Sequence, residues 1–383
     1  MSTAFAARIL DSTVRVEFDE SVPAPVRETI RGHWIDLIDQ GAASEVDVTV
    51  TATMARGRQT SGPEHRVVSA NSPERLAAGI VSEVTLAGIA GLGGEALMLH
   101  AGAVALDDGR VIALVGPSGR GKTTAARALG RAFGYVTDET LAVFPGGEVL
   151  PYRKPLSIGD DPEEKAQLAA STDGLRDLPA APLTLDAIVL LDRREGVETP
   201  YVETVPLLDA IEELVPQTSF LSMLRSPIRT LLTTVLSTGG VRRVVYTEAE
   251  TLASVVDDIL ATRTDESPQL VDVGVSTSDC DCGAKLGEEE VVVDAAPGTI
   301  YRRGEYRDAL SVDDALVVLR RNVVTALRGL GPVLWFAAAD ATAAELTDAA
   351  LQEMPPPPAD IDPAAIVEAT LDELVTADLL VRA

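Results

Sequence analysis

The residues with the most specific chemistry form a glycine-rich loop that ends in a lysine and a threonine. Residues 116–123 read Gly-Pro-Ser-Gly-Arg-Gly-Lys-Thr and match the pattern G-x-x-x-x-G-K-[ST]. Glycines allow successive backbone N–H groups to point at phosphate oxygens, and the N-terminus of a following helix adds positive potential. In this pattern Lys122 binds the β- and γ-phosphates, while the Thr123 hydroxyl binds Mg²⁺. The loop therefore predicts a site for ATP and Mg²⁺. Its expected nucleotide-binding residues are Gly116, Pro117, Ser118, Gly119, Arg120, Gly121, Lys122, Thr123 and Thr124.

A second group of reactive side chains is the acidic pair Asp138 and Glu139, at the end of an apolar, strand-like stretch that begins at Tyr135. One carboxylate could hold Mg²⁺, and the other could accept a proton from an attacking hydroxyl. An isolated Asp-Glu pair at a strand end is usually a solvated turn, so the functional interpretation depends on the nearby loop. Further along, Arg153 or Lys154 could stabilise phosphate charge, with a surface position as the alternative.

Strands and a helix must position these side chains. The apolar run 111–115 leads into the loop as a strand, and residues 124–129 continue from it as a helix. Residues 97–106 and the run 111–115 should pair as a β-hairpin, joined by the tight turn at 107–110. The hairpin would bring His100 near the base of the loop.

Composition excludes several classes of partner. The chain has 383 residues, with 32 Lys and Arg against 59 Asp and Glu, which gives a formal net charge of -27. Such a surface repels nucleic acid and anionic membranes, so neither is expected as a partner. The apolar segment 76–99 contains Glu83, Glu95 and several glycines, which favours a buried helix and a strand over a membrane span. The first residues do not resemble a secretory signal, and we expect a cytoplasmic protein.

The length and the shifts in composition predict four regions. They are an N-terminal α+β extension over residues 1–68, a nucleotide-binding domain over 69–264, a linker over 265–288 and a C-terminal domain over 289–383. The linker contains Cys280 and Cys282, which are too close for an ordinary structural disulfide and supply only two of the four ligands of a structural zinc site. Periodicity predicts strands at 13–18, 46–50, 187–192 and 241–246, and helices at 26–39, 207–214, 219–235 and 251–260.

Together these residues carry a resemblance to a known family. His100 on a strand, the hairpin, the glycine-rich loop, the Asp138-Glu139 pair and Lys154-Pro155-Leu156 resemble the kinase domain of the HPr kinase/phosphorylase family over roughly residues 70–260. The resemblance implies an α/β P-loop kinase domain of the phosphoenolpyruvate-carboxykinase-like type and Mg-ATP-dependent phosphorylation of a hydroxyl. It further implies Asp138 as general base with His100 beside it, Lys122 as the phosphate clamp, and Thr123 and Glu139 at the metal. Assembly as a homo-oligomer is also implied.

Some residues depart from that family's pattern. Thr124 follows Thr123 where the protein kinases of the family resemble Gly-Lys-Ser-Glu, and Glu139 replaces the second aspartate. The chain also lacks a counterpart to the downstream segment that the bifunctional enzymes use for dephosphorylation. The chain therefore looks like an HPr kinase-like protein and not like HPr kinase itself. Its acceptor is left open between a peptide, a protein and a small hydroxyl-bearing molecule.

The C-terminal region resembles a second family. Residues 315–319 and 323–327 should form a hairpin, and Thr342 with Glu345 forms a capping box before a helix. With a short helix from 332 and an amphipathic helix over 366–379, this resembles the PqqD-like winged-helix fold, which implies binding of a leader peptide along a sheet edge. DNA binding is the competing interpretation, but residues 268–383 contain 21 acidic and 8 basic residues, the wrong sign for DNA. A purely structural role is equally open.

Two functions follow from these patterns. The first is an ATP- and Mg²⁺-dependent phosphotransferase acting on a serine- or threonine-type hydroxyl. The second is a non-catalytic ATP-binding adaptor that presents a peptide in a ribosomal-peptide modification system. Formation or absence of a phosphorylated product distinguishes the two.

Overall fold

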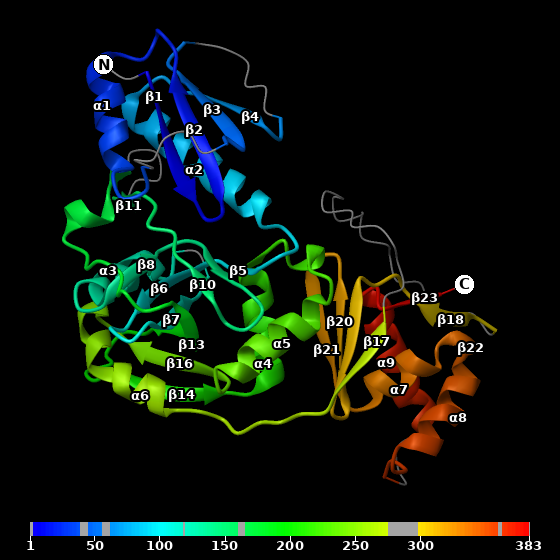
Figure 1. Cartoon of the computed structure of the whole chain (residues 1–383). Coiled ribbons are helices and arrows are strands. Elements are labelled where there is room, and N and C mark those ends of the chain that lie inside the picture. Colours follow the sequence, from blue (N-terminus) through cyan, green and yellow to red (C-terminus); the bar gives the residue numbers. More distant parts are fainter. Residues whose placement is uncertain are drawn as a thin grey trace. The chain divides into compact units, whose positions relative to one another are not determined.

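The computed structural model describes residues 3–38, 45–55, 62–117, 119–159, 165–274, 298–358 and 362–382. The chain divides into two compact units. The first contains residues 1–210, 217–224 and 233–266, and the second contains residues 211–216, 225–232 and 267–383. Both are mixed α/β structures. In Figure 1 the first unit runs from blue to yellow-green, and the second consists of two short green segments and the part of the chain coloured from yellow to red. The four regions expected from the sequence stay a prediction.

The first unit begins with a four-stranded sheet that packs against a long helix. Its strands, in spatial order, are β1 (Ala4–Ile9), β2 (Ser12–Phe18), β3 (Val48–Thr53) and β4 (His65–Ser69). The accompanying helices are α1 (Ala24–His33) and α2 (Pro73–Gly91). The Ser72 hydroxyl accepts a hydrogen bond from the Arg75 backbone N–H at 3.2 Å and so caps the N-terminus of α2.

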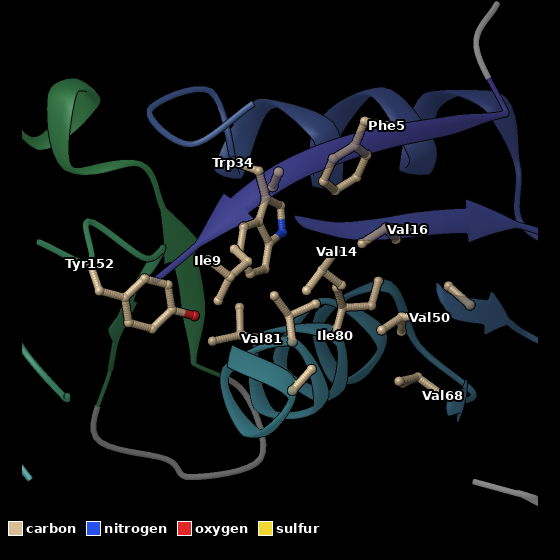
Figure 2. Close-up of a cluster of buried hydrophobic side chains, with 14 of the residues drawn as sticks. Phe5, Ile9, Val14, Val16, Trp34, Val50, Val68, Ile80, Val81 and Tyr152 are labelled. Carbon is tan, nitrogen blue, oxygen red and sulfur yellow. The ribbon is translucent and has the colours of Figure 1, made fainter. Parts of the chain in front are cut away.

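The core between this sheet and α2 reaches beyond the N-terminal residues. Figure 2 shows Ile80 and Val81 of α2 among strand side chains such as Val14, and Tyr152 beside the same cluster. Met98 and Ala142 also belong to it. The N-terminal sheet therefore shares one hydrophobic core with segments that lie next to the candidate site.

The central sheet of the first unit has six strands in the order β14-β16-β13-β7-β6-β8. Strands β7, β13 and β16 are parallel, whereas β6, β8 and β14 run antiparallel to their neighbours. The bounds are β6 (Ala101–Ala105), β7 (Arg110–Val115), β8 (Gly134–Thr137), β13 (Thr184–Arg193), β14 (Tyr201–Val205) and β16 (Val241–Tyr246). Helix α3 (Lys122–Gly130) packs on β6, β7 and β8. The expected hairpin of β6 and β7 is confirmed.

Smaller elements complete this unit and connect it to the second. A four-stranded sheet has the order β10-β9-β5-β15, with β5 (Leu97–Leu99), β9 (Leu141–Val143), β10 (Val149–Leu150) and β15 (Thr218–Ser219). A two-stranded sheet pairs β11 (Leu156–Ile158) with β12 (Ala166–Leu168). The remaining helices of this part of the chain are α4 (Leu207–Leu214), α5 (Pro227–Ser237) and α6 (Val256–Ala261).

Four expected elements differ from the structure. The helix expected over 26–39 ends at His33, and residues 34–37 form a turn. The strand expected over 97–106 is divided at His100 into β5 and β6, which belong to different sheets. The helix expected over 219–235 begins only at Pro227, because the residue before a proline disfavours the helical conformation and proline fits the first helical turn. The first part of the helix expected over 251–260 is a 3₁₀ turn, Ala249–Val255, that precedes α6.

The second unit contains more strands than the sequence predicted. One sheet has the order β17-β19-β20-β21 and the other has the order β22-β18-β23. Their strands are β17 (Leu270–Gly274), β18 (Ile300–Arg303), β19 (Asp308–Val312), β20 (Ala315–Arg320), β21 (Val323–Leu327), β22 (Ala339–Thr342) and β23 (Leu380–Arg382). The helices are α7 (Leu330–Ala337), α8 (Ala343–Glu353) and α9 (Pro363–Thr376). The hairpin of β20 and β21 and the capping box of Thr342 and Glu345 are confirmed.

Two further observations concern earlier expectations. Among the described residues, no helix combines the length and the apolar character that crossing a bilayer requires. Cys280 and Cys282 lie outside the described residues.

Candidate functional site

The glycine-rich loop connects the end of β7 to the start of α3. Gly119 has a φ of +78°, and Gly121, the N-cap of α3, has a φ of +90°. Residues with a side chain rarely adopt this left-handed region, so the chain needs glycine at both positions. A Cβ on Gly119 would meet no heavy atom within 4 Å, so its backbone borders open space. Ser118 lies outside the described residues.

Lys122 lies within this loop. Its side-chain Nζ donates hydrogen bonds to the backbone carbonyls of Gly116 at 2.7 Å and Pro117 at 3.3 Å. Burial lowers the pKa of Lys122, and the negative charges of Glu139 and Asp138 act in the opposite direction. Lys122 is buried, whereas Thr123 is half-buried, and Arg120 and Thr124 are exposed.

The acidic pair follows directly after β8, and a lysine lies between its two carboxylates. Asp138 is buried; its Oδ1 is 3.2 Å from Lys154 Nζ and accepts a hydrogen bond from the Tyr135 hydroxyl at 3.1 Å. Lys154 Nζ is also 2.9 Å from Glu139 Oε2. Burial alone would lower the pKa of Lys154, but Asp138 and Glu139 raise it above its ordinary value. Lys154 is therefore a buried cation that serves both carboxylates.

The Thr137 side chain stabilises the turn that holds the acidic pair. The Thr137 hydroxyl accepts hydrogen bonds from the backbone N–H groups of Glu139 at 3.3 Å and Thr140 at 3.4 Å. A short polar side chain that binds backbone groups two and three residues onward stabilises such a turn. This turn ends β8 and sets the direction in which the two carboxylates leave the sheet.

His100 lies at the point where the chain passes from β5 to β6. Its backbone N–H donates to the Gln217 carbonyl at 2.6 Å, and the next residue, Ala101, donates to the Glu139 carbonyl at 3.0 Å. Burial and the charge of Lys122 lower the pKa of His100, while Glu139 and Asp138 act in the opposite direction. In the described part of the chain, no hydrogen bond joins the His100 and Asp138 side chains.

The loop and the acidic pair meet at Gly102 of β6. A Cβ built on Gly102 would lie 3.4 Å from the Lys122 carbonyl oxygen and 3.7 Å from that of Thr137. The first residue of α3 and the last residue of β8 therefore border one small volume. Electrostatic effects of Asp138 and Glu139 on Lys122 agree with this proximity.

Sequence reasoning missed two contacts of this site. Tyr135 was noted only as the start of a strand, although its hydroxyl binds Asp138. Lys154 was expected either at a phosphate or at the surface, but it is 2 % exposed and paired with the carboxylates, so the surface alternative is wrong. Its neighbour Arg153 points elsewhere, with Nη1 donating to the carbonyls of Tyr135 at 3.1 Å and Arg176 at 2.9 Å. The signal available for Lys154 was its place between Tyr152 and Pro155 in a largely apolar stretch.

Comparisons with known proteins add little to this geometry. No protein-family model matches the chain, and no curated protein matches it. Among solved structures, the chain is similar to the structure of the Hpr(Ser) kinase/phosphatase from Coxiella burnetii, with 12% sequence identity. That similarity covers 43% of this chain and 93% of the other, with a TM-score of 0.25. A similarity at this score is too weak to identify a fold, a family or an activity, so the functional proposal depends on the geometry of the site itself.

Proposed function

We propose that this protein is an ATP- and Mg²⁺-dependent phosphotransferase of the HPr kinase-like type, which transfers the γ-phosphoryl group of ATP to a hydroxyl. The observation that carries the proposal is that the buried Lys122, at the start of α3, and Thr137, directly before the buried Asp138, border one small volume at Gly102. Phosphoryl transfer needs mainly positioning and neutralisation of charge, together with a group that takes the proton of the acceptor.

The geometry of the glycine-rich loop fits a nucleoside triphosphate. Positive φ at Gly119 and Gly121 and the open space at Gly119 are the features of a loop whose backbone approaches phosphates closely. Lys122 would exchange its two carbonyl partners for phosphate oxygens, at little cost because both sets of partners are hydrogen-bond acceptors. Arg120 and Thr124 are exposed beside the loop and would contact the outer parts of the nucleotide.

The residues present also fit Mg²⁺. No group of three or more His, Cys, Asp or Glu side chains that could hold a metal occurs within the described ranges. Mg²⁺ at nucleotide sites needs no such group, because phosphates and water supply most of its ligands. Thr123 and Glu139 would hold the ion, which would neutralise phosphate charge. The Glu139 side chain is 37% exposed, so one of its oxygens can serve Lys154 while the other serves the metal.

The proposed reaction uses the side chains as follows. The acceptor hydroxyl gives its proton to Asp138, and its oxygen forms a bond to the γ-phosphorus. The bond from that phosphorus to the β-phosphate oxygen breaks, and ADP leaves with the electron pair. Burial and the charge of Lys122 lower the pKa of His100, which favours the neutral imidazole beside the site.

A second candidate is the ATP-binding adaptor without transfer. The observation that favours it is the ion pair between Asp138 and Lys154, because the buried ammonium already contacts the carboxylate that would have to accept the proton. In either case, we propose that the C-terminal domain expected over residues 289–383 is a winged-helix module that binds a peptide, because the net negative charge of residues 268–383 disfavours nucleic acid.

Transfer and binding can be measured separately. Mg-ATP affinity is measured by calorimetry, and transfer by mass spectrometry of peptides that co-purify with the protein and are incubated with Mg-ATP. Asp138→Asn should change the dissociation constant by less than about threefold and lower transfer by about 10²- to 10⁴-fold, the contribution of a general base. Lys122→Met should instead weaken Mg-ATP binding.

Full transfer by the Asp138→Asn variant would overturn the assignment of the base. Tight Mg-ATP binding by the unchanged protein, with no phosphorylated product on any peptide or small molecule, would favour the adaptor.

A further inference from the structure

We propose that Tyr135 and Lys154 are positioning residues that fix which oxygen of Asp138 accepts the proton. This inference rests on the proposed function, because it concerns the carboxylate assigned there as the base. Both residues act at Oδ1, which leaves Oδ2 as the oxygen that receives the proton of the acceptor hydroxyl.

The contacts of Asp138 are one-sided. The Tyr135 hydroxyl donates to Oδ1 at 3.1 Å, and Oδ1 is also the carboxylate oxygen nearest to Lys154 Nζ, at 3.2 Å. In the ranges that the structure describes, no hydrogen bond reaches Oδ2. A carboxylate held at one oxygen cannot rotate freely about its Cβ–Cγ bond without losing those contacts. The free oxygen therefore keeps one direction.

Both donors are themselves held in place. Lys154 Nζ contacts Glu139 Oε2 at 2.9 Å and donates to the Pro155 carbonyl at 3.2 Å, so three groups fix a side chain that is almost fully buried. The buried Tyr135 ring lies under the Arg153 guanidinium, whose carbon is 5.8 Å from the ring centroid. Gly130 also lies against the ring, because a Cβ built there would be 3.2 Å from a ring carbon of Tyr135.

The chemistry of Tyr135 and Lys154 suits this role over the pH range in which Asp138 must be ionised. Burial and the charge of Asp138 raise the pKa of Tyr135 well above its ordinary value, so the phenol keeps its proton and remains a donor. Lys154 supplies the positive charge that a buried carboxylate needs. Aligning the base in this way acts on the rate of transfer and leaves the nucleotide contacts of the loop unchanged.

Tyr135→Phe is the principal test, because it removes one hydroxyl, keeps the ring and retains the Lys154 ion pair. Lys154→Met is the second variant, and Lys165→Met, a lysine in the half-buried segment before β12, is the matched control. The rate constant for loss of the γ-phosphoryl group from Mg-ATP is measured in single turnover with water as acceptor, beside the dissociation constant of Mg-ATP.

Tyr135→Phe should lower the rate constant by about tenfold to a hundredfold, the size of effect that a small misplacement of a reacting group produces. Its Mg-ATP dissociation constant should change by less than about threefold, and Lys165→Met should match the unchanged protein in both. If Lys154→Met folds, its loss and that of Tyr135→Phe should not add in the double variant, because both act at one oxygen. Crystal structures should show the Asp138 carboxylate rotated in Tyr135→Phe.

The outcomes separate this inference from the proposed function. A wild-type rate in Tyr135→Phe, with transfer abolished in Asp138→Asn, overturns the positioning role alone. A wild-type rate in Asp138→Asn overturns both, and so does the absence of any γ-phosphoryl loss from Mg-ATP with the unchanged protein, whether water or the co-purifying peptides are the acceptor. Equal weakening of Mg-ATP binding and rate in Tyr135→Phe would assign Tyr135 to the general structure of the site and also overturn the inference.

Discussion

Replacing Gly102 by alanine should destabilise the first unit and weaken the nucleotide site. A Cβ at this position would lie 3.0 Å from the Cβ of Ala126 in α3 and 3.4 Å from the Lys122 carbonyl oxygen. Two carbon atoms in favourable contact are about 3.5–4.0 Å apart, so the overlap is about 0.5–1 Å. Neither neighbour can move by changing a rotamer, so α3 itself must shift away from β6.

The expected magnitude follows from two opposing effects. Overpacking of this kind costs about 1–3 kcal/mol, and replacing a strand glycine by alanine recovers about 0.5–1 kcal/mol of chain entropy. With the middle of each range, the free energy of unfolding should fall by about 1 kcal/mol. The dissociation constant of Mg-ATP should rise, because the shift moves Lys122 and the N-terminus of α3. Urea denaturation and calorimetry measure the two effects.

Two further variants make this test specific. Gly32→Ala in α1 introduces the same methyl group where no heavy atom lies within 4 Å, so it should stabilise the protein by about 0.5–1 kcal/mol. Adding Ala126→Gly to Gly102→Ala removes the overlap and should restore Mg-ATP binding, with a coupling of at least about 0.5 kcal/mol between the two sites. Wild-type stability of Gly102→Ala, or purely additive effects in the double variant, would refute the reasoning.

Three other substitutions test parts of the fold. Burial lowers the pKa of His33, so below the ordinary histidine pKa the unfolded chain binds more protons than the folded one, and the free energy of unfolding decreases as the pH is lowered. His33→Gln should reduce this pH dependence in urea denaturation measured above and below that pKa. An unchanged pH dependence would contradict this. Tyr152→Phe removes the buried 2.7 Å hydrogen bond to Thr85 and should cost about 1–2 kcal/mol, with Thr85→Val in the same background restoring part of the loss; equal stabilities would show that the bond contributes nothing. Thr342→Ala removes the capping box formed with Glu345 and should lower the free energy of unfolding of the second unit, measured by thermal denaturation, by about 1 kcal/mol. No loss would show that packing alone stabilises α8.

Local patterns in the sequence predicted those parts of the fold that local chemistry controls. The strand expected at 241–246 coincides with β16, and the capping box of Thr342 and Glu345 was evident from side-chain type and spacing. The division at His100 was not predictable, because residues on both sides are equally apolar and only the partners of β5 and β6 distinguish them. Those partners depend on sheet pairing between segments far apart in the chain.

The same limit applies to the candidate site. Residue type and spacing nominated Lys122, Asp138 and Glu139, and the chemistry of these residues stays a prediction. Residue type and spacing could not identify the partner of the acidic pair. Lys154 lies beside Asp138 and Glu139 only because of the path that the chain takes from β8 to β11. A lysine in an apolar stretch signals a buried partner but does not say which carboxylate supplies it.

The hydrogen bond between Thr85 and Tyr152 has a consequence for how far the first unit can be shortened. Thr85 lies on α2, which packs against the N-terminal sheet, and Tyr152 stands two residues before the lysine between the carboxylates. A chain cut to begin near Pro73 would keep every residue of the proposed reaction. It would lose the sheet that packs against α2, and with it the support for Tyr152, which precedes Lys154 by two residues. The N-terminal strands therefore help to hold the acidic pair in position. Removing them should impair the proposed reaction, although every residue that takes part in it is retained.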